Sequence, residues 1–92
     1  MSNFLIEIPH SDNIKECKYA IQVFLESGSH LLANADWGCS DGEHKTWLII
    51  DTDTREQARQ IVPPLFREHA KITKLVKFIK ESTEEGLKYH QA

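Results

Sequence analysis

A change of hydrophobic period near the start of the chain constrains its fold more than any other feature. The stretch FLIEIPH, residues 4–10, has a period of two. Its Phe4, Ile6 and Ile8 point to one side, which predicts a strand with one buried face. Pro9 ends this strand, because proline cannot donate to a sheet ladder. The next residues turn to a helical period, so a strand leads directly into a helix.

The helical stretch reads SDNIKECKYAIQVFLESG, residues 11–28. Asn13 followed by Glu16 has the spacing of a capping box, and Gly28 suits the position just past a helix end. One apolar stripe is expected to face the core, comprising Ile14, Cys17, Ile21, Phe24 and Leu25. The stretch therefore predicts a helix between Asn13 and Gly28, with Cys17 packed as a small hydrophobic residue.

Two further apolar stretches flank the tripeptide SDG, which is the clearest hairpin signal in the chain. HLLANADWGC, residues 30–39, and HKTWLIIDTD, residues 44–53, are predicted strands, because Asp-Gly tolerates the positive φ of tight turns. The run Trp47–Ile50 is apolar on both faces. This run indicates a strand covered on two sides, by the rest of the chain or by a partner subunit.

The loop of this hairpin leaves two registers open. With a two-residue loop at Asp41-Gly42, Cys39 lies opposite His44 with Cβ atoms about 5 Å apart. With a three-residue Ser-Asp-Gly loop and a glycine bulge, Cys39 instead faces Glu43 and His44 points to the other side. A metal site at the hairpin depends on the first register.

The stretch DTDTREQARQIV, residues 51–62, predicts a second helix. Both DTRE and TREQ within it have capping-box spacing. Its buried stripe is expected to comprise Ala58, Ile61, Val62 and Leu65. Pro63 and Pro64 should break or kink this helix, because each proline removes a helix donor.

The stretch AKITKLVKFIK, residues 70–80, fits two periods. As a strand it places Ile72, Val76 and Phe78 on one face with Lys74 between them, and as a helix it gives an apolar stripe that periodicity alone slightly favours. We predict a strand, because a strand here completes a regular βαββαβ unit. The polar tail ESTEEGLKYHQA, residues 81–92, is predicted to be a short frayed helix beyond a single domain of residues 1–80.

The order β-α-β-β-α-β is the split βαβ, or ferredoxin-like, pattern of the α+β class. We predict a four-stranded antiparallel sheet of order 4-1-3-2 with two helices on one face. Following the chain direction through this pattern gathers five reactive side chains at one rim, namely His10, Cys39, Asp41, His44 and His69. His30 falls at the opposite end.

Imidazole and thiolate are favoured ligands of zinc and nickel. We therefore predict that this rim binds a small ligand or a divalent transition metal; in the metal version zinc or nickel is held by His10, Cys39, His44 and His69. The spacing from Cys39 to His44 matches no established metal motif. The alternative is a set of loop side chains that face water.

A second hypothesis is a cofactor-free enzyme, of the isomerase or monooxygenase kind, with a cavity over the helix-free face of the sheet. Trp37 and Trp47 would form its walls, Asp36 its polar partner, and His10 or His44 the general base. An apolar face left in water favours a homodimer that encloses such a cavity. A third hypothesis is a structural or regulatory protein-interaction module without a small ligand.

Composition narrows the class of protein. The 92 residues suit one domain, and the net charge of −3 argues against nucleic-acid binding. No run of about 18 apolar residues exists, so no membrane span is expected. The start MSNFLIEIPH does not read as a secretory leader, and two cysteines make no disulfide framework. We therefore expect a cytoplasmic protein with reduced thiols.

Two resemblances follow from these elements. The element order over residues 3–80 resembles the dimeric α/β-barrel group of ferredoxin-like proteins, which includes muconolactone isomerases and cofactor-free monooxygenases; no catalytic motif carries over. The stretches GSHLLANADWGCSDGEHKTW and PPLFREHAKI are similar to a set of short bacterial proteins of unknown function. That resemblance implies no activity, but it supports a strand at AKITKLVKF.

Overall fold

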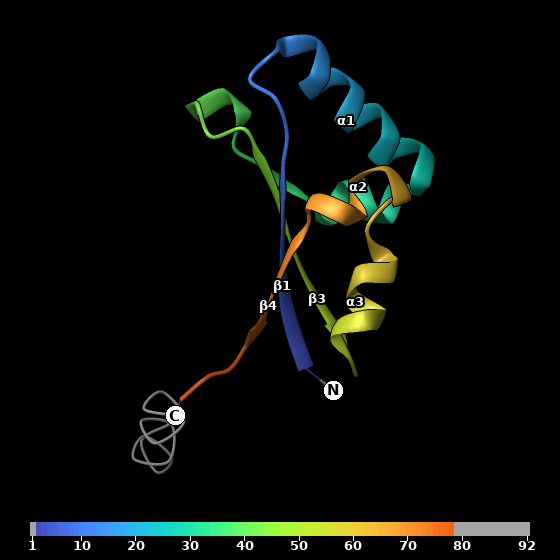
Figure 1. Ribbon diagram of the computed structural model, residues 1–92, viewed down its shortest axis with the longest axis vertical. Helices are drawn as coiled ribbons and strands as arrows, with labels where there is room; N and C mark the ends of the chain where they lie inside the picture. The colour runs from blue at the N-terminus through green and yellow to red at the C-terminus, as the bar shows by residue number, and fades with distance from the viewer. Residues whose placement is uncertain (1, 79–92) are drawn as a thin grey trace.

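The computed structural model describes residues 2–78 and shows one antiparallel sheet with helices packed against it (Figure 1). The strands are β1 (Ser2–Pro9), β2 (Asp36–Trp37), β3 (Lys45–Thr52) and β4 (Lys71–Leu75). The helices are α1 (Ile14–Ser27), α2 (Ser29–Asn34) and α3 (Arg55–Ile61), with short 3-10 turns η1 (Cys39–Asp41) and η2 (Pro64–His69). The α+β class is confirmed. Within the described residues, no helix is both long and apolar enough to cross a bilayer.

The sheet has the spatial order β2-β3-β1-β4, so β1 and β3 lie in the middle. Both neighbours of β1 pair with it antiparallel, and β2 pairs antiparallel with β3. Read from the other edge, this order is 4-1-3-2, although α2, η1 and η2 add elements that the βαββαβ pattern lacks.

The core lies between the sheet and the helices. The predicted alternation of β1 is confirmed, because Phe4, Ile6 and Ile8 are buried. They cluster with Phe24 of α1 and Leu48 of β3. Figure 1 shows α1, α2 and α3 on the same side of the sheet. In the part of the chain that the structure describes, no helix covers the opposite face.

Helix α1 begins and ends where its sequence predicts. The Oδ1 atom of Asn13 accepts a hydrogen bond from the backbone N–H of Lys15 at 2.8 Å, and Gly28 follows the helix with φ 139°. The predicted buried stripe is wrong in part. Cys17 and Phe24 are buried, but Ile14 is 69% exposed.

The partial exposure of the predicted apolar stripe follows from how α1 packs against the sheet. Ile21 and Leu25 are also largely exposed, whereas Ala20 is buried with Cys17 and Phe24. The spacing 17, 20, 24 is one narrow line along a helix. Helix α1 therefore meets the rest of the protein along a single edge and leaves the neighbouring apolar line uncovered.

The predicted strand over residues 30–39 is largely wrong. Residues Ser29–Asn34 form helix α2, and only Asp36–Trp37 form a strand. Leu31, Leu32 and Ala35 all pack against the core. Adjacent residues of a strand point to opposite faces, whereas a helix can turn both leucines and Ala35 inward.

The hairpin has the register of the first alternative but neither of the predicted loops. Asp36 pairs with Trp47 and Trp37 with Thr46, a register that sets Cys39 across from His44 if continued. The ladder ends at Trp37, and Cys39–Asp41 form a 3-10 turn instead.

Gly38 permits this close turn. A Cβ atom at Gly38 would lie 2.6 Å from the carbonyl oxygen of Glu43 and 2.8 Å from the ring of Trp47. The Gly38 N–H donates to the Lys45 carbonyl at 3.1 Å, and the Gly38 carbonyl accepts from the Glu43 N–H at 3.0 Å. Any side chain at Gly38 would therefore force the hairpin apart.

Helix α3 uses one of its two predicted capping boxes. The Thr54 hydroxyl accepts from the Gln57 N–H, and the Gln57 side chain accepts from the Thr54 N–H, both at 3.1 Å. The helix ends at Ile61, before the two prolines, as predicted. Its stripe is only partly buried, because Ala58 and Val62 are buried while Ile61 and Leu65 are largely exposed.

The last described segment is a strand, as predicted, but a shorter one. Strand β4 covers Lys71–Leu75, so Val76 and Phe78 lie beyond it and are exposed. The predictions for residues 79–92, including the frayed helical tail, lie outside the described residues.

Candidate metal centre

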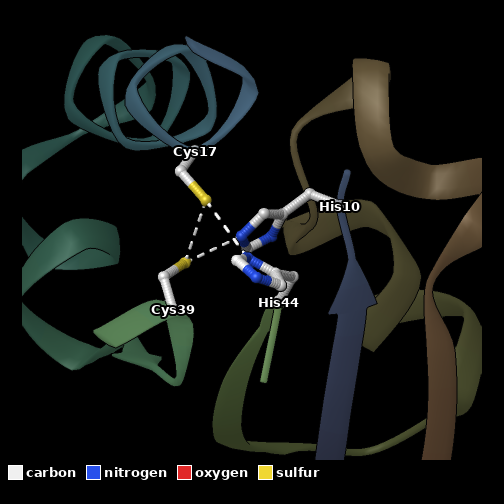
Figure 2. Close-up of side chains that lie close together, drawn as sticks. All are labelled: His10, Cys17, Cys39 and His44. Carbon is white, nitrogen blue, oxygen red and sulfur yellow. Dashed lines mark hydrogen bonds between the residues drawn. The ribbon is translucent and has the colours of Figure 1, made fainter. Parts of the chain in front are cut away.

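Four side chains from four different segments converge at the end of β1 (Figure 2). His10 follows β1, Cys17 lies in the first part of α1, Cys39 begins η1, and His44 precedes β3. The two imidazoles and two thiols point toward one another, and their ligand atoms all lie within 4.8 Å of one another. We call this group the rim cluster.

The distances within the rim cluster suit a single small cation. The Nε2 atom of His10 lies 2.9 Å from Sγ of Cys39, which lies 3.2 Å from Sγ of Cys17. The Sγ atom of Cys17 lies 3.6 Å from Nδ1 of His44. Tetrahedral zinc, with Zn–S about 2.3 Å and Zn–N about 2.0–2.1 Å, holds its ligand atoms about 3.3–3.8 Å apart. Shifts of about 1 Å or less would therefore complete the shell.

Strand register brings three of these side chains together. The backbone N–H of His10 donates to the carbonyl of His44 at 3.0 Å and so extends the β1–β3 pairing beyond Pro9 and Lys45. On its other side, His44 faces the turn that starts at Cys39. His44 therefore lies between His10 and Cys39.

Alternation along the strands turns these side chains to the helix-covered face. His10 continues the even-numbered series of Phe4, Ile6 and Ile8, all buried beneath the helices. His44 is two residues from Thr46, which is buried and pairs with Trp37.

Cys17 is the fourth member of the rim cluster and reaches it from helix α1. The Asn13 cap starts α1 directly over the end of β1, and the Cys17 N–H donates to the Asn13 carbonyl at 3.1 Å. The first turns of α1 therefore hold this sulfur against the strands.

Burial and mutual proximity shift the pKa values of two members of the cluster toward their uncharged forms. Burial, followed by the nearby His44, lowers the pKa of His10. Burial, followed by the hydrogen bond and the charge of Cys17, raises the pKa of the Cys39 thiol. Two thiolates so close together repel each other, and a dication would remove that repulsion.

His69 does not belong to the rim cluster. It is exposed and lines a small pocket of about 170 Å³ with Glu7, Pro9, Lys45 and Lys71. Glu7, Pro9 and Lys45 alternate with buried residues of β1 and β3, so this pocket opens on the helix-free face of the sheet. The predicted ligand set is therefore corrected: the structure places His69 on the open face and Cys17 at the cluster. Asp41 is exposed in η1 and is also outside it.

The two tryptophans do not line one wall. Trp37 faces the helices, with its ring 5.1 Å from Phe24 and 6.0 Å from His10. Trp47 lies on the opposite face, where its Nε1–H donates to Oε1 of Glu7 at 3.3 Å. Asp36, which pairs with Trp47, shares that open face. The predicted pocket of Asp36, Trp37 and Trp47 is wrong, because adjacent residues of a strand alternate between faces.

A wider groove of about 420 Å³ lies on the helix side, at a distance along β3 from the rim cluster. Its floor is apolar and its edge polar, and it is lined by Ser27, Gly28, His30, Leu31, Asn34, Leu48, Ile50 and Ile61. Among the described residues that line it, only His30 is titratable, and these residues hold no metal-ligand set.

Comparison with protein-family models, with curated proteins and with solved structures finds no match for this chain. The chemistry of the rim cluster is therefore judged from its residue types and its geometry. Two cysteines and two histidines with converging ligand atoms form the donor set of structural zinc sites.

Proposed function

We propose that this protein binds one divalent transition metal ion, zinc in the first place, through His10, Cys17, Cys39 and His44. The convergence of four ligand atoms within 4.8 Å carries this proposal. Tetrahedral sites of two sulfurs and two nitrogens are typical of zinc, whereas nickel often prefers a planar arrangement. Zinc is therefore the first choice and nickel the second.

The role we propose for the ion is structural. Four protein ligands fill a tetrahedral shell and leave no position for a substrate. The ion would join the ends of β1 and β3 to the first turns of α1 and to η1. Since α1 meets the rest of the protein along one edge, a link at its N-terminal end adds directly to the stability of the fold.

Calorimetric titration of the reduced, metal-free protein with Zn²⁺ tests this function. We expect one ion per chain, and an affinity lower by roughly 100-fold or more in Cys39→Ser, because about 10–16 kcal/mol of binding is shared by four ligands. His69→Gln is the matched control, since this imidazole lies outside the cluster, and it should bind as the wild type does. Unchanged affinity in Cys39→Ser would end the proposal.

Cobalt substitution tests the geometry separately. Co²⁺ in a tetrahedral site with two sulfur ligands gives intense visible absorption bands together with sulfur-to-metal charge-transfer bands. We expect these bands in the wild type and in His69→Gln. Cys17→Ser should weaken the charge-transfer bands if Cys17, which the sequence did not predict as a ligand, occupies the fourth position.

We further propose that the architecture is ferredoxin-like and that the chain is related to the short bacterial proteins that its sequence resembles. We also propose that two copies pair through the open face of the sheet, in a reducing cytoplasm. The spatial order of the strands and the common side of the helices support the first part. On the open face, Ile49 is 62% exposed beside Leu5, its partner in β1. Sedimentation of Ile49→Lys against the wild type tests pairing, and equal masses would contradict it.

A further inference from the structure

We propose that Cys17 and Cys39 also form a reversible disulfide, so that a peroxide can expel the metal from the rim cluster. The inference rests on the proposed metal site and adds its regulation. Both cysteines are free thiols, and their sulfurs are 3.2 Å apart. A disulfide needs about 2.05 Å, so the two sulfurs have only about 1 Å left to close.

The two cysteines come from two different elements of the fold. Cys17 lies in α1 and Cys39 at the start of the short turn η1, 22 positions apart in sequence. A covalent link would therefore close a loop that includes the rest of α1, α2 and β2. It would hold the N-terminal end of α1 to the hairpin when the metal no longer does.

The environments of the two sulfurs differ in a way that assigns their roles. Cys17 is only 7% exposed, on the buried side of α1, whereas Cys39 is half-buried in the surface turn η1. A small oxidant therefore reaches Cys39 first, and Cys17 is the resolving thiol. In the zinc-loaded protein the cluster nitrogens are ligands and carry no proton to give, so the hydroxide released at each step takes its proton from solvent water.

The chemistry balances with hydrogen peroxide as the oxidant. The Cys39 thiolate attacks one peroxide oxygen, the O–O bond breaks, and the released hydroxide takes a proton to become water. The Cys17 thiolate then attacks the sulfenic sulfur of Cys39, the S–S bond forms, and a second hydroxide leaves and is protonated. Two thiolates lose two electrons in total, one peroxide becomes two waters, and the metal loses both sulfur ligands.

The test exposes the zinc-loaded protein to one equivalent of hydrogen peroxide per chain. A chromogenic chelator reports released zinc, and intact mass reports the thiols. We expect one zinc released per chain and a mass lower by two hydrogens than that of the reduced, metal-free protein. Dithiothreitol with added zinc should restore both readings. An unchanged mass, or a mass raised by oxygen atoms alone, would overturn the inference.

Matched variants separate this inference from the metal site itself. Cys17→Ala keeps the exposed sulfur but lacks the resolving thiol, so one equivalent of peroxide should add a single oxygen to Cys39, as a sulfenic acid, without the loss of two hydrogens that marks the disulfide. Cys39→Ala should react far more slowly, because its one remaining sulfur is buried. Metal-free wild type is treated in parallel, with circular dichroism to confirm that each variant folds. If the wild type forms the disulfide but binds no zinc, the proposed metal site is contradicted and the disulfide is supported. If it binds zinc but forms no disulfide, the metal site is supported and the disulfide is contradicted.

Discussion

Helices α1 and α3 cover the same face of the sheet but attach to it in different ways. Helix α3 is short, begins in a complete capping box, and places Ala58 in the core. Helix α1 is twice as long, yet Ile14, Ile21 and Leu25 remain exposed along it. Local hydrogen bonds and packing are enough for α3, whereas α1 is held along one narrow buried line that runs from Cys17 of the rim cluster through Ala20 to Phe24.

This difference between the helices gives a physical reason for a metal site at the N-terminal end of α1. A helix held by one buried line of side chains is free to pivot about it, and its N-terminal end is the part farthest from Phe24. A four-ligand ion at that end prevents the pivot. We therefore expect the two helices to respond differently to loss of packing, loss of metal, loss of a cap and a change of pH.

The largest effect should come from the packed end of α1. Phe24 is fully buried against Trp37 and Phe66, with ring centroids 5.1 and 5.9 Å away. We expect Phe24→Ala to lower the free energy of unfolding by about 3–5 kcal/mol, because it removes a buried ring and leaves a cavity. Urea unfolding of the zinc-loaded protein measures this change. Ile14→Ala is the matched control and should cost far less; equal losses would mean that α1 packs along its whole stripe.

Removal of the metal should come next and should separate the two helices. At a free zinc concentration of about 100 times Kd, we expect the metal to add about 2.7 kcal/mol to stability. Thermal unfolding with and without a chelator measures that gain. Hydrogen exchange should quicken in the N-terminal half of α1 and in η1, while the amides of α3 change little. Comparable quickening in both helices would show that the ion stabilises the whole domain rather than α1.

Loss of a helix cap should have a smaller effect that differs in kind between the helices. Thr54→Ala removes the capping hydroxyl of α3, and Asn13→Ala removes that of α1; each should cost about 1 kcal/mol. Only Asn13→Ala should also weaken zinc binding, because the turn that it starts carries Cys17. Calorimetric titration of both variants checks this difference. Weaker binding in Thr54→Ala would break the separation of the two helices.

The smallest effect should be a pH dependence of the metal-free protein. Since burial and His44 lower the pKa of His10, the folded chain binds fewer protons than the unfolded chain in mildly acidic solution. The corresponding stability is present above about pH 6.5 and is lost as the pH falls through the lowered pKa. Urea unfolding at about pH 7.5 and about pH 5.5 measures the loss, which should be smaller in His10→Gln. An equal pH dependence in that variant would assign the effect to other groups.

Much of the fold was predictable because its signals are local. The alternation of β1, the capping residues Asn13 and Thr54 and the two prolines after α3 act through neighbours in the chain. Helix α2 was not predicted, because six residues carry too little periodic signal against a neighbouring hairpin motif. The exposed half of the α1 stripe was not predictable either, since amphipathic spacing does not show how much of a helix a small sheet can cover.

The candidate site was predicted in three of its four members. His10, Cys39 and His44 follow from chain direction alone, because strand ends meet at one rim. A signal for Cys17 was present: Ile8 is on the buried face, so His10 is too, and a helix packed on that face starts nearby. Cys17 was assigned to the core because a buried cysteine and a metal-ligating cysteine occupy the same face of an amphipathic helix.

The sequence by itself determined the course of β1, β3, α1 and α3, and that reactive side chains gather at one rim. Those features depend on backbone hydrogen bonding and hydrophobic period, which residues close in the chain control. Only the tertiary structure decided which side chains share a centre. Ligand atoms must meet within a few ångströms, and a shift of one residue in register or a small rotation of a helix is enough to exchange Cys17 for His69.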